Sequence, residues 1–249
     1  MTAAPANRPV ALVTGAARRV GAAIARTLHA AGYDLALHYR HSGEDMRALC
    51  AELESSRPGS TLAVQAELVD TGRLPALVDA VIARYGRLDA LVNNASTYYA
   101  TPMGSATTAQ WDELFGANAR APFFLSQAAA PHLRKARGAI VNIADIYAER
   151  PLPGHAVYCM SKAAIGMLTR VLAVELGPEV RVNAVAPGNV LWSTNAEKAE
   201  TATMIEERTT LGRQGSPQDI ADAVRFLLQD AGYCSGVTLA VDGGRLLHI

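Results

Sequence analysis

The chain has 249 residues, half of them hydrophobic and only 18% charged, so it contains enough apolar material for a large buried core. Its 23 basic and 23 acidic side chains cancel, and this balance gives no sign of a nucleic-acid partner. The three cysteines (Cys50, Cys159 and Cys234) form neither a CxxC pair nor a metal-ligand spacing. We therefore expect no metal site, and reduced thiols in a cytoplasmic protein.

The N-terminal residues, 1–8, are rich in alanine and proline and lack the apolar stretch of a signal peptide. We expect them to form a flexible arm. No apolar run approaches the roughly 20 residues that a membrane span requires, so we expect no membrane partner.

Short apolar runs alternate with longer helical stretches along the rest of the chain. Strands are expected at residues 10–13, 33–39, 62–65, 88–92, 139–143, 180–185 and 238–241, and helices at 19–31, 44–54, 73–85, 109–133, 155–176 and 217–228. The strand runs consist mostly of Val, Leu, Ile and Ala, as in parallel strands that are buried on both faces. The pattern predicts one domain over residues 1–249. Its fold class is α/β, a doubly wound (Rossmann-type) seven-stranded parallel sheet with helices on both faces, which binds ligands at the carboxyl ends of its strands.

A polar segment, residues 189–215, interrupts this alternation before the last helix and is rich in Thr, Glu and Asn. Because it follows a strand, it would lie beside the carboxyl edge of the sheet, and we expect a substrate lid there. An ordinary pair of surface helices is the alternative. Leu191 and Trp192 in this segment would either wall the substrate pocket or pack within the lid.

A glycine-containing turn follows the first strand. Gly15 and Gly21 lie six residues apart at the passage from strand to helix. Such a turn lets backbone N–H groups and a helix N-terminus approach a pyrophosphate. Ala17 replaces the middle glycine of the familiar pattern, so a tight turn without a ligand is the alternative. We predict a dinucleotide site there that includes Gly15, Arg19 and Val20.

The end of the second strand indicates which dinucleotide binds. NAD-binding proteins usually place an acidic residue there to hold the ribose 2′-OH. This chain has Tyr39, Arg40, His41 and Ser42 instead. A guanidinium pairs with a 2′-phosphate whereas a carboxylate repels it, and Arg19 adds a second cation, so we predict NADPH. A solvated loop cation is the alternative for Arg40.

The ends of the third and fourth strands supply further predicted cofactor contacts. At the third, an acidic side chain, Glu67, is placed to meet the adenine amino group. At the fourth, Asn94 either borders the cofactor or stops the strand and caps a turn. The predicted contacts at these two ends are Glu67, Leu68, Asn94, Ala95 and Ser96.

The residues most suggestive of catalysis are Tyr158 and Lys162, which share one face of a helix if the segment is helical. A lysine beside a phenol favours the phenolate, so the tyrosine becomes a proton donor and acceptor near neutral pH. Asp145 lies 13 residues upstream. Its carboxyl group can deliver a proton, although Asp is also common as a cap at the start of turns.

Together these motifs resemble the short-chain dehydrogenase/reductase family over essentially the whole chain. The matching pieces are Thr14-Gly15-x3-Arg19-x-Gly21, Asn93-Asn94-Ala95, Asn118, Tyr158-x3-Lys162 and Pro187-Gly188. The resemblance implies that Tyr158 is the catalytic acid and that Lys162 binds the nicotinamide ribose and lowers the pKa of the phenol. It also implies that Asn118 holds a water in a proton relay, and that the chain is a homotetramer. The nicotinamide pocket would be lined by Pro187, Gly188, Asn189 and Val190.

Asp145 restricts the resemblance to one branch of the family, because most members have serine at this position. The pteridine reductase branch has aspartate. In that branch an aromatic residue at the Tyr98 position, usually phenylalanine, stacks on the pterin, and an arginine at the Arg19 position reaches both phosphate and substrate. The chain lacks the long insertion before Phe115 found in some parasite enzymes, so it is similar to compact bacterial dihydrofolate and dihydromonapterin reductases.

The expected function is therefore NADPH-dependent reduction of a pterin ring C=N, converting a dihydropterin or dihydrofolate to its tetrahydro form. Fully oxidised pterins are further possible substrates. Asp145 and Tyr158 would share one proton and titrate as a unit, with Lys162 tuning the pair. The expected substrate contacts are Arg19, Ser96, Tyr98, Asp145, Tyr158, Leu191 and Trp192. The alternatives are a reductase of ketones or 3-ketoacyl thioesters, and a nucleotide-sensing regulator, which the presence of Asn118, Tyr158 and Lys162 disfavours.

Overall fold

The structure, a computed structural model, describes residues 8–190 and 202–248. Seven strands form one parallel sheet in the order β3-β2-β1-β4-β5-β6-β7. The strands are β1 (Val10–Val13), β2 (Asp34–Tyr39), β3 (Thr61–Gln65), β4 (Ala90–Asn93), β5 (Ala139–Ile143), β6 (Arg181–Pro187) and β7 (Thr238–Val241). The predicted doubly wound sheet is confirmed.

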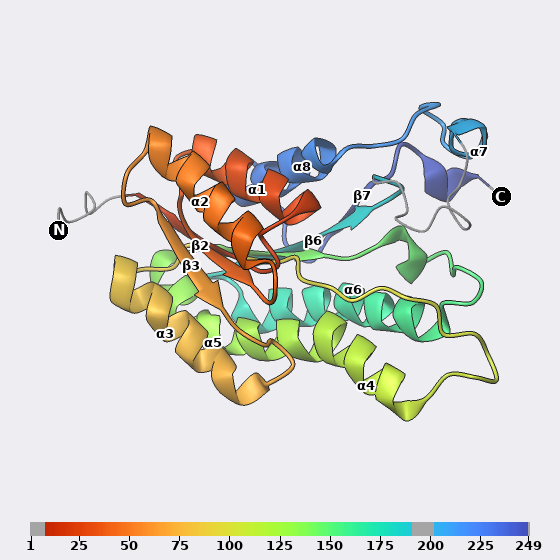
Figure 1. The fold of residues 1–249 in the computed structure, drawn as a ribbon, viewed down its shortest axis with the longest axis horizontal. Helices are drawn as coiled ribbons and strands as arrows, with labels where there is room; N and C mark the ends of the chain where they lie inside the picture. Colours follow the sequence, from red (N-terminus) through yellow and green to blue (C-terminus); the bar gives the residue numbers. More distant parts are fainter. Residues whose placement is uncertain (1–7, 191–201, 249) are drawn as a thin grey trace.

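Helices cover both faces of the sheet (Figure 1). One layer holds α1 (Arg19–Ala30), α2 (Gly43–Ser56) and α8 (Pro217–Gln229). The other holds α3 (Leu74–Tyr85), α4 (Thr108–Phe115), α5 (Ala121–Ala136) and α6 (Ala156–Leu176). The chain also contains the short helix α7 (Ala202–Glu207) and the single turns η1 (Thr71–Arg73), η3 (Ile146–Ala148) and η5 (Arg245–Leu247).

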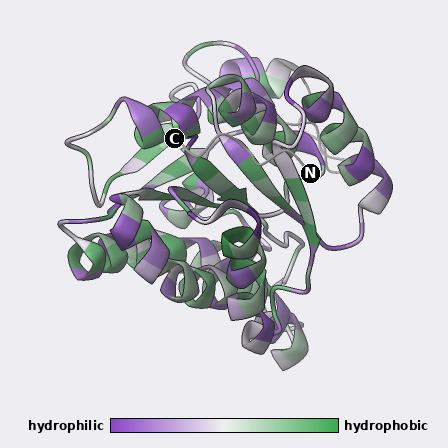
Figure 2. Cartoon of the chain, turned by 90° about the vertical axis from the view of Figure 1, so that its left-hand side faces the viewer, coloured by the Kyte–Doolittle hydropathy of each residue, from purple (hydrophilic) through white to green (hydrophobic). Residues whose placement is uncertain are grey.

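The five central strands are buried on both faces, as their apolar runs predict, whereas the edge strands β3 and β7 are partly exposed. In β1, Ala11 and Val13 belong to the core beneath α1, α2 and α8, whereas Val10 and Leu12 belong to the core over α3, α5 and α6. This alternation follows from the two-residue period of a strand. Figure 2 accordingly shows largely hydrophobic strands between helices of mixed character.

The helix predicted over residues 109–133 is interrupted. Between α4 and α5 the chain forms a π-helical turn, η2 (Gly116–Arg120), which contains Asn118. Such turns occur frequently at functional sites. No spacing of apolar residues indicated this irregularity, because the hydrophobic pattern continues across it.

Helix α6 corrects the expectation that no apolar stretch is long enough to span a membrane. Its 21 residues have a mean hydropathy of 1.4 over their most apolar window, so by length and composition it could cross a membrane. In the structure α6 packs against β6 and η3, and it carries the buried ammonium side chain of Lys162. Core helices that are apolar on most faces have this composition too. We therefore interpret α6 as part of the core.

The topology fixes where ligands can bind. Strand β1 lies between β2 and β4, where the strand order reverses, and a crevice forms at such a switch point. The side chain of Thr14, just after β1, accepts hydrogen bonds from the backbone nitrogens of Asn94 (2.9 Å) and Ala95 (3.0 Å), just after β4. These two hydrogen bonds hold the ends of β1 and β4 together at the edge of the crevice.

Candidate active site

A cleft of about 1570 Å³ runs along the carboxyl edge of the sheet. It brings together most of the residues predicted from the sequence: Gly15, Arg19, Val20, Tyr39, Arg40, His41, Ser42, Glu67, Leu68, Asn94, Ala95, Ser96, Tyr98, Asp145, Tyr158, Lys162, Pro187, Gly188, Asn189 and Val190. Asn118 lies behind this lining, buried. Leu191 and Trp192 lie outside the described residues, as does the part of the predicted lid from residue 191 to 201.

The glycine turn is shaped for close approach of a ligand. Gly15 has a left-handed backbone (φ 62°), and a Cβ added to Gly21 would lie 2.1 Å from the carbonyl oxygen of Gly15. The side chain of Asn94 donates to the carbonyls of Thr14 (2.8 Å) and Gly15 (3.1 Å), so the capping alternative for Asn94 is correct even though the residue borders the cleft. The turn and the N-terminus of α1 thus fit a pyrophosphate.

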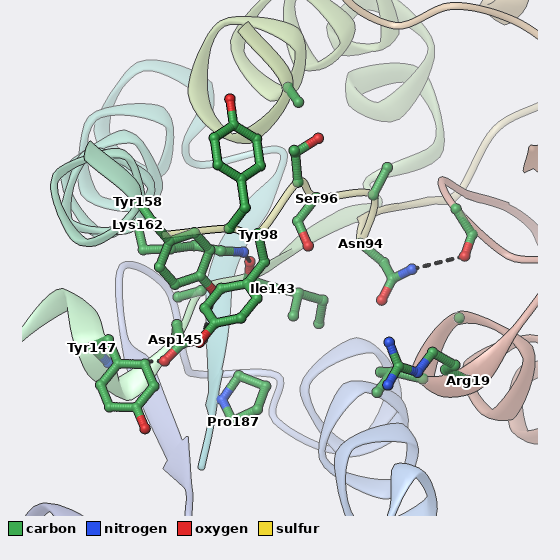
Figure 3. A pocket seen from close by; sticks show the side chains of 18 of the residues that line it. Arg19, Asn94, Ser96, Tyr98, Ile143, Asp145, Tyr147, Tyr158, Lys162 and Pro187 are labelled. Atoms are coloured by element: carbon green, nitrogen blue, oxygen red, sulfur yellow. Dashed lines mark hydrogen bonds between the residues drawn. The ribbon is translucent and has the colours of Figure 1, made fainter. Parts of the chain in front are cut away.

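Arg19 lies at the far side of the pocket from Tyr158 (Figure 3). It adopts a left-handed backbone conformation (φ 54°) that is strained for a residue with a Cβ. Its guanidinium has no ion-pair partner among the described residues. Strain retained at a residue that lines a cleft is typical of functional positions.

His38, which lies in β2, supports the glycine turn. The backbone N–H of Gly15 donates to Nδ1 (3.2 Å), so the other ring nitrogen carries the proton and donates to the Ala66 carbonyl (3.1 Å). Burial lowers the pKa of this imidazole, which favours that neutral form. The only sequence signal was a histidine next to the end of a buried strand.

The two charged residues predicted to meet the adenosine end of the cofactor bind each other. Arg40 Nε lies 2.6 Å from Glu67 Oε2, and both side chains are partly exposed. Nearby, Arg18 pairs with Asp45 across the rim (2.5 Å). Since exposed ion pairs contribute little free energy, a 2′-phosphate can compete with Glu67 for Arg40.

The centre of the site is a short hydrogen bond. The hydroxyl of Tyr158, from α6, donates to Asp145 Oδ2 at 2.6 Å, and the other carboxylate oxygen accepts from the Tyr147 backbone N–H at 2.9 Å. The second bond caps η3. One oxygen of Asp145 therefore caps a turn, as the alternative for this residue has it, and the other meets the phenol. Delivery of a proton by Asp145 remains a prediction.

Burial raises the pKa of the Asp145 carboxyl, against the opposing effects of the Tyr158 hydroxyl and the Tyr147 N–H. Burial, followed by the negative charge of Asp145, raises the pKa of Tyr158 well above its ordinary value of 10.0. Two acidic groups at this distance avoid ionising together, so the pair retains one proton more readily than either group would alone.

Lys162 lies on the same helix as Tyr158, four residues further along. Its Nζ donates to the Ile143 carbonyl at 2.9 Å and lies 5.9 Å from the centre of the Tyr158 ring. Burial lowers the pKa of its amine to about 8. Burial and Asp145 raise the pKa of Tyr158, and a lowering effect of Lys162 on this phenol remains a prediction.

Asn118 organises the site from behind. Its Oδ1 accepts from the Thr97 N–H (2.8 Å), and its Nδ2 donates to the Thr97 carbonyl (3.0 Å) and to Ser161 Oγ (3.0 Å). Ser161 in turn donates to the carbonyl of Tyr158 (2.7 Å). Asn118 thereby joins the loop after β4 to the catalytic helix, and its part in a proton relay remains a prediction.

An aromatic wall stands beside the acid pair. The ring of Tyr98, 55% exposed, meets the Tyr158 ring edge-on at 4.8 Å and stacks on His155 at 5.0 Å. Figure 3 shows Tyr98, Tyr158 and Asp145 grouped together, with Tyr147 to one side. Sequence reasoning missed His155 and Tyr147 as cleft residues. The adjacency of Tyr147 to Asp145 was the available signal.

Comparison with known proteins now identifies the family. A family model described as enoyl-(acyl carrier protein) reductase matches residues 15–245. The chain belongs to the short-chain dehydrogenase/reductase family. Its resemblance to the pteridine reductase branch is also confirmed, since it is 37% identical to pteridine reductase 1 of Leishmania tarentolae over 98% of each chain. Members of the family use a nicotinamide cofactor, and this chain is an oxidoreductase.

Other relatives of this short-chain reductase have names that indicate different substrates. It is 38% identical to a granaticin polyketide synthase putative ketoacyl reductase of Streptomyces violaceoruber, over 95% of each chain. It is also 36% identical to 3beta-hydroxysteroid dehydrogenase 1 of Eggerthella lenta, over 95% of this chain and 93% of that one. Identity over the whole chain therefore does not separate a pterin from a ketone as substrate, and the residues of the site must do so.

Proposed function

We propose that this short-chain reductase uses NADPH to reduce the ring C=N of a pterin, converting a dihydropterin or dihydrofolate to its tetrahydro form. The observation that carries the proposal is the 2.6 Å hydrogen bond between the Tyr158 hydroxyl and the Asp145 carboxylate. A ketone needs only a phenol as its acid, with a hydroxyl to orient the carbonyl. A ring imine needs a proton placed on nitrogen, for which a protonated carboxyl–phenol pair is suited.

NADPH, when bound, supplies the hydride. The chain's own residues hold and position the proton. The raised pKa of Asp145 keeps a proton on the pair closer to neutral pH. The Tyr147 N–H fixes the carboxyl group, and the Asn118–Ser161 network fixes the backbone that carries Tyr158. Such positioning makes proton transfer effective.

The preference for the phosphorylated cofactor rests on charge. The end of β2 lacks an acidic residue, and Arg19 and Arg40 line the cleft. Guanidinium groups bind phosphate in a bidentate manner. Lys162, which lines the cleft, would hold the nicotinamide ribose. The glycine turn would hold the pyrophosphate.

The wall formed by Tyr98 and His155 supports a flat substrate. Stacked and edge-on aromatic contacts are favourable for rings, and the exposed ring of Tyr98 presents one side to the cleft. The second candidate function is reduction of 3-ketoacyl thioesters. It is favoured by the similarity to a ketoacyl reductase. Tyr158 and Lys162 serve either reaction, whereas Asp145 and Tyr98 favour the pterin.

A substrate panel tests the proposal. NADPH oxidation is followed with biopterin, dihydrobiopterin, dihydrofolate, a 3-ketoacyl thioester and a simple quinone. We expect the highest kcat/KM with a dihydropterin or dihydrofolate. Turnover of the thioester and the quinone without any pterin would support the second candidate and rule out the first.

We further propose a homotetramer in the cytoplasm. The three cysteines are free thiols, which agrees with a reducing compartment. Helix α6 carries a stripe of exposed apolar side chains, which a subunit interface would cover: Met160, Met167, Val171 and Val174.

A further inference from the structure

Beyond Tyr147 the cleft continues past a group of basic side chains that the proposed chemistry does not use. They are Arg150, Arg208, Arg245 and His248. Arg150 comes from the segment after η3, Arg208 from the segment after α7, and the other two from η5 and the residue that follows it. Residues far apart in the sequence thus line the same cleft.

Arg150 is held in a fixed relation to the catalytic acid. Asp145 caps η3, and the backbone nitrogen of Arg150 donates to the carbonyl of Ile146, the first residue of that turn, at 3.0 Å. Its guanidinium Nη1 donates to the Arg245 carbonyl at 3.2 Å. Because one end is tied to η3 and the other to η5, the cation is positioned rather than free in solvent.

The carboxylates that line the cleft do not neutralise Arg150. Within residues 8–190 and 202–248, Glu67 pairs with Arg40, Glu113 accepts from the Tyr99 hydroxyl, and Asp145 accepts from Tyr158. The fourth carboxylate of the lining, Asp112, forms no ion pair with the described residues. No ion pair of Arg150 is present in that part of the chain.

The nearby turn also uses its own carboxylate internally. Asp242 accepts from the backbone nitrogens of Gly244 and Leu246, which folds the turn that presents Arg245. On the same edge, His248 Nε2 lies 3.0 Å from Thr210 Oγ1. This end of the cleft therefore presents the guanidinium of Arg150 on a built framework.

We propose that Arg150, with Arg245 and His248 beside it, forms a subsite for an anionic group on the tail of the substrate, a carboxylate or a phosphate. A guanidinium matches both groups in a bidentate geometry. The subsite extends the proposed function, since it lies in the same cleft as Asp145 and Tyr158, beyond the ring that these residues would protonate. It makes acidic-tailed substrates, such as folates with their glutamate, better ligands than pterins with short neutral side chains.

The test is a ratio of Michaelis constants. KM is measured with NADPH for dihydrofolate, whose tail carries carboxylates, and for dihydrobiopterin, whose side chain is neutral. We expect Arg150→Gln to raise the ratio of the dihydrofolate KM to the dihydrobiopterin KM about tenfold, as for loss of one charge-assisted hydrogen bond. Salt should weaken the wild-type preference in the same direction.

A matched arginine provides the control. Arg134 also donates to a backbone carbonyl, that of Glu175, but lies outside the cleft. Arg134→Gln should leave the ratio at its wild-type value. An identical ratio in wild type and Arg150→Gln would overturn the subsite. A phosphorylated dihydropterin compared with its unphosphorylated form distinguishes phosphate from carboxylate as the preferred anion.

Failure of the subsite can be separated from failure of the proposed function. If no pterin is reduced, the proposed function fails. The subsite is then tested with a 3-ketoacyl-CoA, whose tail carries phosphates, against the uncharged N-acetylcysteamine thioester of the same acid. A ratio that Arg150→Gln raises about tenfold supports the subsite in a ketone reductase, and an unchanged ratio rejects it.

Discussion

Asp145 combines two roles that are usually assigned to different residues. One carboxylate oxygen fixes the start of η3 and the other meets the Tyr158 hydroxyl. The capping bond restrains the acid, and burial raises its pKa. A sequence pattern can indicate either role separately. It cannot show that both oxygens are used, because the phenol comes from a helix 13 residues further along the chain.

The first prediction concerns pH. The protonated pair is the donor, and the pKa of Asp145 lies above its ordinary 3.8, so the proton is present at low pH and is lost as the pH rises. The kcat/KM for a dihydropterin should therefore fall as the pH rises through the apparent pKa of the pair. Asp145→Asn keeps an oxygen for the Tyr147 N–H but cannot ionise. We expect the variant to lose about 10² in kcat/KM. Its kcat/KM should also no longer fall as the pH rises through this apparent pKa. A profile of unchanged shape in the variant would remove Asp145 from proton transfer.

The second prediction concerns Arg19, whose left-handed backbone stores strain next to the cofactor turn. Glycine adopts this conformation without a steric penalty, so Arg19→Gly should raise the free energy of unfolding by about 1 kcal/mol while weakening NADPH binding. Arg137 is the control, because it has φ 51° at the end of α5 and does not line the cleft. Arg137→Gly should stabilise the fold by a similar amount and leave NADPH binding unchanged. Equal effects of both variants on NADPH affinity would count against a ligand role for Arg19.

At the scale of elements, the apolar runs predicted all seven strands, and the five central ones are buried on both faces, where strands read as continuous hydrophobic segments. The turn with Gly15 and Gly21 and the pair Tyr158 and Lys162 were also predicted, since their spacing is local. The π-helical turn around residue 118 was not, because it leaves the apolar pattern intact. His38 and Arg150 were missed because their partners come from other strands and turns.

The third prediction tests the close packing of the cofactor turn. A Cβ at Gly21 would meet the Gly15 carbonyl oxygen at 2.1 Å, so Gly21→Ala forces the turn to shift. We expect a loss of about 1–3 kcal/mol in the free energy of unfolding, measured with denaturant, together with weaker NADPH binding. Gly166→Ala in α6 is the control, since its Cβ would meet nothing within 4 Å. That variant should stabilise the protein by about 0.5–1 kcal/mol. A neutral effect of Gly21→Ala would show that the turn is looser than described.

At the scale of the whole molecule, the exposed apolar stripe on α6 is the clearest unexplained surface. Met160, Met167, Val171 and Val174 lie at intervals of seven, four and three residues, which places them along one face. Val174 is 81% exposed. Helix–helix contacts between subunits would cover such a face, and they would also hold the catalytic helix in place from outside.

The fourth prediction follows from that stripe. Light scattering after size-exclusion chromatography should give four times the mass of one chain for the wild type. The double variant Met167→Glu, Val174→Lys should yield smaller species, because charges at an interface core oppose association. The substitution Glu175→Lys, one position along the helix, changes charge outside the stripe and should preserve the assembly. A wild-type monomer at micromolar concentration would contradict the proposed tetramer.

The central claim, that Asp145 adapts a short-chain reductase to a ring imine, is tested most directly by a change in specificity. The kcat/KM values for dihydrobiopterin and for a 3-ketoacyl thioester are measured with NADPH in the wild type and in Asp145→Ser. We predict that the variant loses about 10² or more with the pterin and much less with the thioester, so the ratio of the two constants falls. An equal loss with both substrates, or wild-type activity confined to the thioester, would contradict the account.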